Sequence, residues 1–449
     1  MNFKNIPCIL LSVLIVLGCS SDEAGLEAPV HGTITVDESI DNSGDYAEIG
    51  VTIIKKDSAN VDADTLFNAL TDEEGKFSGT AQFPRHRQYR VIISRNNQNL
   101  GSTGIILAND DTVEISAQLP NLNNTLQISS REHTAYRTYQ RVEKSFRRVG
   151  AFAQAGRLRG DSLRQELEKW PDIYWQVYQE SPQTIAGHLS AKKSIDLLSR
   201  WDKNAMMQKV RAVQHDDDLA YLGATYGKAY MAKEQGLDAA LAYLDTLKTN
   251  TQRPKERMQI AMERISLMYD SAQIAQTRTA LASFEKEYPD NSIAKDWAKS
   301  VSYDLEYLSP GDAIPEFSFK ANNEEISRES LKGQPYLLEI TSFVSPIYQQ
   351  QFDRTVVIHS IYKNYDFQIV TIPIDSSQVT VDAFFEQRMR PWPVASARAF
   401  YDQEIMKTFN IKNLPTRFLV DRNGKIHQRY IGQEYENIVQ GIQQLMKNN

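Results

Sequence analysis

The segment PYLLEITSFVSPIY, residues 335–348, carries the strongest fold signal in this chain. It begins as a continuous apolar run of the kind that forms a buried strand, which a Ser-Pro pair then interrupts. A serine before a proline is a favoured start of a helix, and residues 349–365 are amphipathic. The segment therefore predicts a strand, a turn and a helix, with Ser345 as the N-cap of that helix.

The rest of the C-terminal region continues this alternation of strands and helices. Residues 366–375 (DFQIVTIPID) predict a buried strand, and residues 379–390 predict a helix. Residues 413–432 (NLPTRFLVDRNGKIHQRYIG) predict a loop with a candidate cis-proline at Pro415, then a hairpin that turns at residues 421–424. A last helix is expected over residues 433–447.

In this order and spacing, residues 310–449 resemble the thioredoxin superfamily, specifically the membrane-anchored TlpA-like thiol-disulfide oxidoreductases. The resemblance implies an α/β domain whose pattern is an apolar strand, then Trp-Cys-x-Pro-Cys, then a helix. Residues 392–394 (WPV) also match a pattern common in this branch. Aligned on the motif, Phe343 takes the tryptophan position, and Val344 and Ile347 take the two cysteine positions.

The two replaced cysteines decide the expected chemistry. Disulfide exchange requires an attacking and a leaving thiolate, and neither valine nor isoleucine can supply one. The chain contains two cysteines, Cys8 and Cys19, and both lie in the N-terminal export segment. A peroxidase mechanism fails for the same reason. The sequence therefore predicts a domain without catalytic residues, metal or cofactor, and a protein that is not an enzyme.

In active relatives, the surface around the cysteine pair and the cis-proline binds extended peptides. The resemblance therefore implies a candidate binding groove here. An equally weighted alternative is that the replacement side chains simply fill the former active-site cleft. The residues of this candidate groove are Phe343, Val344, Ser345, Pro346, Ile347, Trp392, Leu414 and Pro415.

The N-terminus predicts export and lipid anchoring. Residues 1–18 contain a single Lys4 and an apolar run too short to span a bilayer, and Cys19 follows as in a bacterial lipobox. Lipid on Cys19 would hold the protein to the outer membrane. Ser20, Ser21, Asp22 and Glu23 resemble the acidic export signal of Bacteroidota surface lipoproteins. This favours the cell surface, with the periplasmic face as the alternative, and residues 19–28 are expected to form an acidic tether.

Two further domains are expected before the C-terminal one. Residues 29–120 show period-2 alternation between turns, which predicts an antiparallel β-sandwich resembling carboxypeptidase-regulatory or transthyretin-like domains. Residues 131–306 show long helical periodicity interrupted by prolines and resemble irregular tetratricopeptide-type hairpins. The fold class is thus a multidomain α+β protein with a β-sandwich, a helical-hairpin region and a thioredoxin-like α/β domain.

Charge and motif content narrow the classes of function. A formal net charge of −7 argues against nucleic acid as the main partner. The most metal-like run, residues 215–218 (HDDD), precedes a helix expected near Leu219 and is interpreted as an N-terminal cap. His31, His86 and His133 are isolated in sequence, which favours structural roles.

These observations predict a non-catalytic outer-membrane lipoprotein. It would act as a protein-binding or accessory subunit of an outer-membrane transport or assembly complex. Two alternatives remain at this stage. One is a thiol-disulfide oxidoreductase or peroxidase-like protein, as the fold alone would suggest, and the other is a surface glycan-binding lipoprotein.

Overall fold

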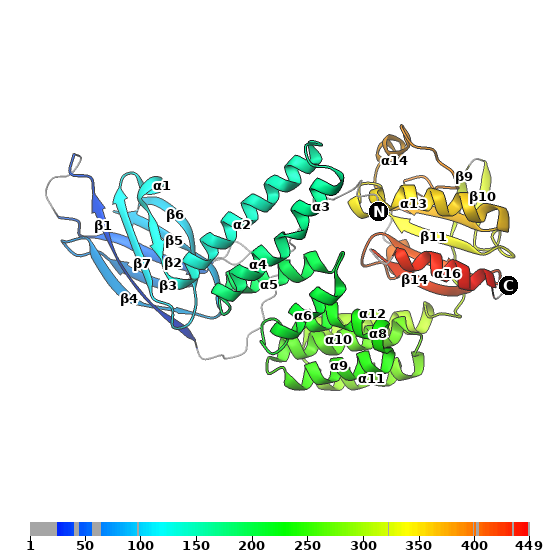
Figure 1. Ribbon diagram of the computed structural model, residues 1–449, viewed down its shortest axis with the longest axis horizontal. Coiled ribbons are helices and arrows are strands. Elements are labelled where there is room, and N and C mark those ends of the chain that lie inside the picture. Colours follow the sequence, from blue (N-terminus) through cyan, green and yellow to red (C-terminus); the bar gives the residue numbers. More distant parts are fainter. Residues whose placement is uncertain are drawn as a thin grey trace. The chain divides into compact units, whose positions relative to one another are not determined.

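The computed structural model describes residues 25–39, 45–55, 64–96, 98–321, 323–397, 399–400, 404–432 and 435–447. The predicted lipid site at Cys19 and the export residues 20–23 lie outside these ranges. The chain divides into two compact units, Met1–Tyr230 and Met231–Asn449, so the boundary falls inside the predicted helical region (Figure 1). Within the described residues, no helix is both long and apolar enough to cross a membrane.

The first unit begins with two sheets that share one hydrophobic core (Figure 1). One sheet has the order β4-β1-β7-β8 and the other β3-β2-β5-β6. Inward residues such as Ile34 and Ile115 from the first sheet, and Val51 and Ile93 from the second, are fully buried, as period-2 alternation requires. The strands are β1 (Leu26–Val36), β2 (Ile49–Lys55), β3 (Asp64–Leu70), β4 (Lys76–Phe83), β5 (Arg87–Arg95), β6 (Gln98–Leu107), β7 (Val113–Leu119) and β8 (Gln127–Ser129).

The expectation of a fully antiparallel sandwich is wrong at one pair. Strands β1 and β7 run parallel, with Val30 opposite Val113 and Val36 opposite Leu119. Alternation along a strand reports which face is buried, and it does not report the direction of the neighbouring strand. For the same reason the sequence alone does not reveal that the first and last long strands of this domain pair with each other.

Helices complete the first unit. They are α1 (Leu122–Thr125), α2 (Arg131–Gln154), α3 (Gly160–Glu168), α4 (Trp170–Glu180), α5 (Ile185–Leu198), α6 (Lys203–Val213) and α7 (Ala220–Leu222), followed by a π-helical segment at Gly223–Gly227. The fully buried Glu132 on α2 accepts a hydrogen bond from the Ile185 backbone N–H on α5 and pairs with His86 Nε2 of the sandwich at 3.0 Å. One carboxylate therefore joins the sandwich to two helices.

The second unit begins with antiparallel helices around a core that includes Met258, Leu281, Phe284 and Leu305. They are α8 (Lys228–Gln235), which crosses the unit boundary, α9 (Leu237–Asn250), α10 (Pro254–Asp270), α11 (Ile274–Glu287) and α12 (Ser292–Tyr307). Pro254 occupies the first turn of α10, where its missing N–H costs nothing, as the sequence predicts. The tetratricopeptide-like character of this region stays a prediction.

The C-terminal domain is a four-stranded sheet of order β12-β11-β13-β14 (Figure 1). Strand β11 runs parallel to β12 and antiparallel to β13. Helices α13, α14 and α16 cover one face, and the β9–β10 hairpin and α15 lie against the other. The elements are β9 (Ser318–Ala321), β10 (Glu324–Ser327), β11 (Tyr336–Thr341), α13 (Pro346–Tyr362), a 3-10 turn (Lys363–Tyr365), β12 (Gln368–Pro373), α14 (Gln378–Phe385), α15 (Glu404–Thr408), β13 (Thr416–Val420), β14 (Ile426–Ile431) and α16 (Glu436–Lys447).

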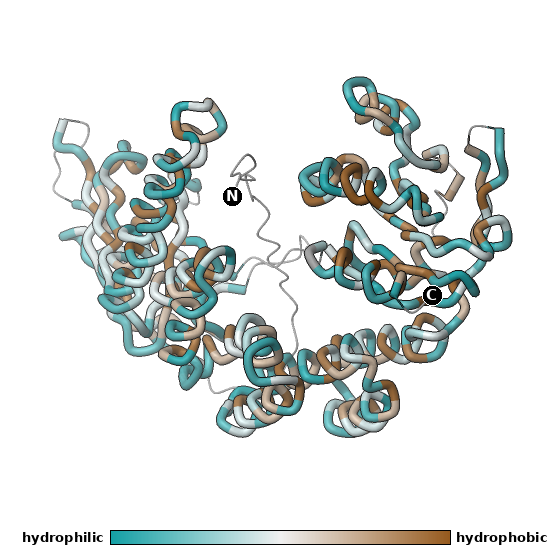
Figure 2. The backbone as a smooth tube through the Cα atoms, turned by 45° about the vertical axis from the view of Figure 1, so that its right-hand side comes forward, coloured by the Kyte–Doolittle hydropathy of each residue, from teal (hydrophilic) through white to brown (hydrophobic). Residues whose placement is uncertain are grey.

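Most of these elements confirm the predictions for this region. All six residues of β11 are buried, because both faces of the sheet are covered, and Figure 2 shows hydrophobic stretches alternating with hydrophilic ones through both units. The turn at Asp421–Gly424 closes the last hairpin, with Gly424 at φ +74°. Helix α14 ends at Phe385, five residues before its predicted end. The guanidinium groups of Arg388 and Arg390 lie over the rings of Phe384 and Phe385.

Helix α12 is tied to the C-terminal domain through Asn410. The Asn410 amide donates to the Ser300 backbone oxygen and, at 2.8 Å, to Asp304 Oδ1. Arg429 Nη1 of β14 lies 2.9 Å from the same Asp304 oxygen. Burial raises the pKa of Asp304, and the Arg429 charge opposes that shift. These contacts join the helical hairpins of the second unit to its α/β domain.

Candidate functional site

The turn between β11 and α13 is held by a carboxylate from the neighbouring strand. Asp375, just beyond the end of β12, accepts hydrogen bonds from Ser342 Oγ at 2.7 Å and from the Phe343 backbone N–H at 2.9 Å. The Ser342 hydroxyl in turn lies 3.4 Å from the Val344 N–H. The carboxyl ends of two parallel strands therefore define the position of Val344.

Helix α13 begins as the sequence predicts. Ser345 is its N-cap, with the hydroxyl accepting from the Tyr348 N–H, and Pro346 occupies the first turn. The positive end of the helix dipole thus lies beside Val344 and Ile347. A thiol at such a position would have a lowered pKa and would react as a thiolate. Val344 is instead an apolar side chain with 64% of its surface exposed.

The candidate cis-proline is confirmed, because the Leu414–Pro415 peptide bond is cis. Thr416, the next residue, pairs with Ile340 near the end of β11, so Pro415 lies at the same end of the sheet as the Ser342–Val344 turn. The Pro415 carbonyl accepts a hydrogen bond from the Gly432 N–H at 2.8 Å. The two parts of the sequence that define this site, separated by about 70 residues, are thereby brought to one edge.

The predicted groove residues divide into accessible and buried ones. Val344 and Pro346 are exposed, and Ser345, Ile347 and Leu414 are half-buried. Phe343 and Trp392 are in the core, with 1% and 3% of their surfaces exposed. The Phe343 ring packs on Phe384 with centroids 4.7 Å apart, and Trp392 Nε1 donates to Thr371 Oγ1. The accessible part of the predicted groove is therefore narrower than the sequence suggests.

A family model described as thioredoxin-like matches residues 342–426, which include the turn, β12, the cis-proline loop and the hairpin. The C-terminal domain is thioredoxin-like. Curated proteins agree with this match. The thiol-disulfide oxidoreductase ResA of Bacillus thuringiensis (strain Al Hakam) is 24% identical over 139 residues, covering 31% of this chain and 79% of the relative. ResA of Bacillus subtilis (strain 168) is 22% identical over 143 residues, covering 32% and 78%.

Solved structures similar to this chain also cover about a third of it. The thioredoxin domain of a thiol-disulfide oxidoreductase from Bacteroides vulgatus has 18% identity and a TM-score of 0.28, covering 30% of this chain and 98% of that one. A thiol-disulfide oxidoreductase from Bacteroides fragilis has 20% identity and a TM-score of 0.26, covering 29% and 99%. The family model and the curated relatives confirm the predicted thioredoxin-like, TlpA-like character of the C-terminal domain, and they add its homology with ResA-type proteins.

The thioredoxin-like domain contains a buried polar network that sequence reasoning missed. Arg417 Nε of β13 donates to Glu339 Oε1 of β11 at 2.7 Å, and neither side chain is more than 1% exposed. Tyr348 OH and Thr371 Oγ1 both donate to Glu339 Oε2. Burial raises the pKa of Tyr348 well above its ordinary value. The available signal was a glutamate inside an apolar strand, because such a residue needs a partner in the core.

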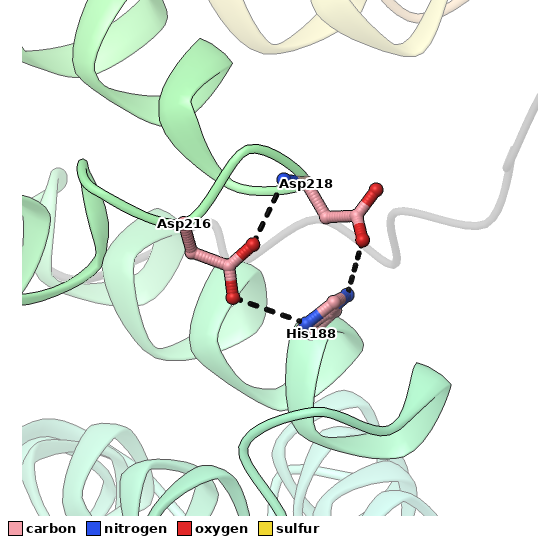
Figure 3. A group of neighbouring side chains, drawn as sticks. All are labelled: His188, Asp216 and Asp218. Carbon is pink, nitrogen blue, oxygen red and sulfur yellow. Dashed lines mark hydrogen bonds and ion pairs between the residues drawn. The ribbon is translucent and has the colours of Figure 1, made fainter. Parts of the chain in front are cut away.

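A second polar cluster lies in the first unit and also was not predicted. His188, in the first turns of α5, is 3.4 Å from Asp216 through Nε2 and 3.9 Å from Asp218 through Nδ1 (Figure 3). The interpretation of residues 215–218 as a helix cap is wrong. Helix α7 has Leu219 at its N-cap position and no side-chain cap, and Asp216 instead caps its own turn by accepting the Asp218 N–H at 2.8 Å. Sequence spacing could not place His188, because it is 28 residues away.

Proposed function

We propose that this chain is a non-catalytic outer-membrane lipoprotein whose redox-inactive thioredoxin-like domain binds a protein partner. In this proposal it acts as an accessory subunit of a transport or assembly complex. The observation that carries the proposal is that the structural features of a thioredoxin-like active site are present while its nucleophilic side chain is absent. The N-cap at Ser345 and the cis-peptide at Pro415 are present, whereas the exposed side chain at the start of α13 is Val344.

The lack of redox chemistry follows from composition. Thiol-disulfide exchange proceeds through a mixed disulfide, and no atom of Val344 or Ile347 can form one. The cysteines of the chain are Cys8 and Cys19, and neither belongs to the thioredoxin-like domain. In the proposal Cys19 carries lipid as the mature N-terminus, which would leave it unavailable for exchange.

Binding is supported by the chemistry of the accessible turn. Val344, Pro346 and the half-buried Ile347 and Leu414 present apolar surface at the edge where the cis-proline loop ends. Apolar contact next to a peptide backbone is the combination that recognises an extended segment. Asp375 and the Ser345 cap hold the turn in place, so little conformational entropy is lost on binding.

The test is affinity purification of the full-length lipidated chain from its native outer membrane in mild detergent, followed by mass spectrometry. We expect an outer-membrane protein at near-equal amount. Val344→Asp should reduce its recovery at least tenfold, because a charge would have to be desolvated in an apolar contact. The matched control is Val379→Asp on α14, a valine that is 76% exposed outside the turn. Recovery of the chain alone, or equal loss in both variants, would contradict the proposal.

A second candidate function is thiol-disulfide oxidoreduction, which the names of the curated relatives favour. For this chain it would require a thiolate supplied by a residue outside the turn, and the C-terminal domain contains no cysteine in sequence. Consumption of a disulfide substrate by the purified chain, abolished by a Cys19→Ser substitution, would support this candidate. Equal background rates for both proteins would exclude it.

A further inference from the structure

Two carboxylates flank the imidazole of His188 in the helical part of the first unit. Asp216 Oδ2 lies 3.4 Å from Nε2, and Asp218 Oδ2 lies 3.9 Å from Nδ1 (Figure 3). All three groups are half-buried, with 21%, 29% and 34% of their side-chain surfaces exposed. One ligand atom from each residue falls within 4.8 Å of the other two. This inference does not rest on the proposed function, because the cluster lies outside the thioredoxin-like domain.

The orientation of Asp216 is set before any ligand binds. Its Oδ1 accepts the Asp218 N–H, and its backbone oxygen accepts the N–H groups of Leu219 and Ala220. These bonds aim the remaining oxygen, Oδ2, at His188. The histidine itself is held by α5, where its N–H bonds to the Thr184 backbone oxygen. The two groups therefore approach each other from separately anchored elements.

The His188 ring nitrogen that faces Asp216 has an unusual environment. Nε2 is shielded from solvent and makes no hydrogen bond within the described part of the chain, although a carboxylate oxygen is 3.4 Å away. A neutral imidazole has one N–H, so when Nδ1 carries it toward Asp218, Nε2 presents a lone pair to the lone pairs of Asp216. A cation between Nε2 and Oδ2 would satisfy both atoms.

We propose that His188, Asp216 and Asp218 bind a divalent transition metal ion of the zinc class. One imidazole nitrogen with two carboxylates is a donor set that suits Zn²⁺ or Co²⁺ better than Mg²⁺ or Ca²⁺, which prefer oxygen ligands alone. The separation of 3.4 Å between Nε2 and Oδ2 matches two donors of a tetrahedral ion with bonds of about 2.0–2.1 Å. Asp218, whose Oδ2 lies 3.9 Å from Nδ1 in this structure, would turn from Nδ1 toward the ion on Nε2 to become the third ligand, and water would complete the coordination.

The proposal is tested by titrating the chelator-treated full-length chain with ZnCl₂ and with CoCl₂, using MgCl₂ as the comparison ion. We expect one Zn²⁺ per chain and a tetrahedral Co²⁺ visible spectrum. His188→Gln and Asp216→Asn should each weaken Zn²⁺ binding at least tenfold. The matched controls are His215→Gln and Asp217→Asn, adjacent residues of the same types outside the cluster, which should leave binding unchanged. Far-UV circular dichroism verifies that each variant is folded.

Two results would overturn the proposal. One is Zn²⁺ binding that is equal in wild type, His188→Gln and Asp216→Asn, which would mean an adventitious ion only. The other is no Zn²⁺ uptake by the wild-type chain above the Mg²⁺ level. If His188→Gln does not fold, Asp218→Asn supplies the same comparison from a half-buried residue in the turn before α7.

Discussion

Glu339 and Arg417 show what the residue scale contributes to the thioredoxin-like domain. The pair is fully buried, and each member has further partners, with Arg417 Nη1 donating to Gln351 Oε1 and Tyr348 OH donating to Glu339. A buried ion pair gives little net stability over an apolar pair, but removing one partner leaves an unpaired charge in the core. Glu339 and Arg417 lie directly opposite each other on β11 and β13, so we expect the pair to favour this register more than to add net stability.

This role makes a stability prediction. Arg417→Met should lower the free energy of unfolding by about 3–5 kcal/mol, because Glu339 loses its counter-charge in the core. The double variant Glu339→Leu with Arg417→Met should recover more than half of that loss. Urea unfolding of the full chain, followed by circular dichroism, measures both. If the double variant were no more stable than Arg417→Met, the unpaired Glu339 charge would not be the cause of the loss. The hydrogen bonds of Tyr348, Thr371 and Gln351 to the pair would then account for it.

His133 makes a prediction about pH. Its Nε2 accepts the Ile106 N–H at 2.9 Å, and burial, helped by the Arg137 charge, lowers its pKa from 6.5. In the unfolded chain His133 binds its proton near pH 6.5, whereas in the folded chain it binds only at a lower pH. The free energy of unfolding therefore falls as the pH drops from 6.5 to the lowered pKa of the folded state. His133→Gln keeps an acceptor without a titrating group. Between pH 7 and 5, the free energy of unfolding should therefore fall less steeply in this variant than in wild type. Equal slopes in the two proteins would contradict the role of His133.

At this scale, local chemistry could be predicted from sequence and long-range pairing could not. Ser345 and Pro415 are recognisable because a cap or a cis-proline depends on its immediate neighbours. The burial of Phe343 depends on α14 packing over it, and the position of His188 beside Asp216 depends on how two helices meet. Neither relation is encoded in spacing along the chain.

At the scale of elements, helix α5 starts where it does because glycine permits a close approach. A Cβ on Gly187 would lie 2.0 Å from the backbone oxygen of Ser181, the C-cap of α4, so the first turn of α5 packs directly on the backbone of the α4–α5 connection. Element types and most boundaries were predictable, because buried strands and amphipathic helices have distinct periods. Strand β3 was not predicted, and residues 223–227 were predicted to be helical but not π-helical, because apolar periodicity does not distinguish the two helix types over five residues.

This packing predicts opposite effects for two glycine substitutions. Gly187→Ala should lower the free energy of unfolding by about 1–3 kcal/mol, because a backbone atom must move to admit the methyl group. Gly150→Ala in α2 should raise it by about 0.5–1 kcal/mol, because nothing lies within 4 Å of that Cβ and alanine favours the helix. Thermal unfolding of the two variants in parallel measures the difference. Equal effects of the two changes would show that the contact of Gly187 with the Ser181 backbone is loose.

At the scale of the whole molecule, the unit boundary at Tyr230 cuts the helical region that the sequence presents as one domain. Helices α2–α7 belong to the same compact unit as the sandwich, and α9–α12 to the same unit as the thioredoxin-like domain. Composition changes little along residues 131–306, so the division could not be recognised from sequence. It rests on tertiary contacts such as those of Glu132 in the first unit and Asn410 in the second.

The junction within the second unit gives a prediction at this scale. Asn410 has φ +45°, so Asn410→Gly removes the hydrogen bonds of its side-chain amide with Ser300 and Asp304 while keeping the backbone conformation. We expect a loss of about 1–3 kcal/mol, because the half-buried Asp304 loses the Asn410 amide as a hydrogen-bond donor and keeps Arg429. Asn323→Gly, at φ +67° in the β9–β10 hairpin, is the control and should be neutral. Urea unfolding measures the stability of both variants. Equal stability would contradict a stabilising contact between α12 and the C-terminal domain through Asn410.

The most direct test of the central claim, a thioredoxin-like scaffold without redox chemistry, is the reduction of insulin disulfides by the purified chain with dithiothreitol as electron donor. Wild type should match the protein-free rate, whereas Val344→Cys with Ile347→Cys should exceed it, because the α13 N-terminus and Pro415 are already in place. A wild-type rate above background that is lost in Cys19→Ser would contradict the account, because it would show disulfide exchange by a thiol of the chain itself.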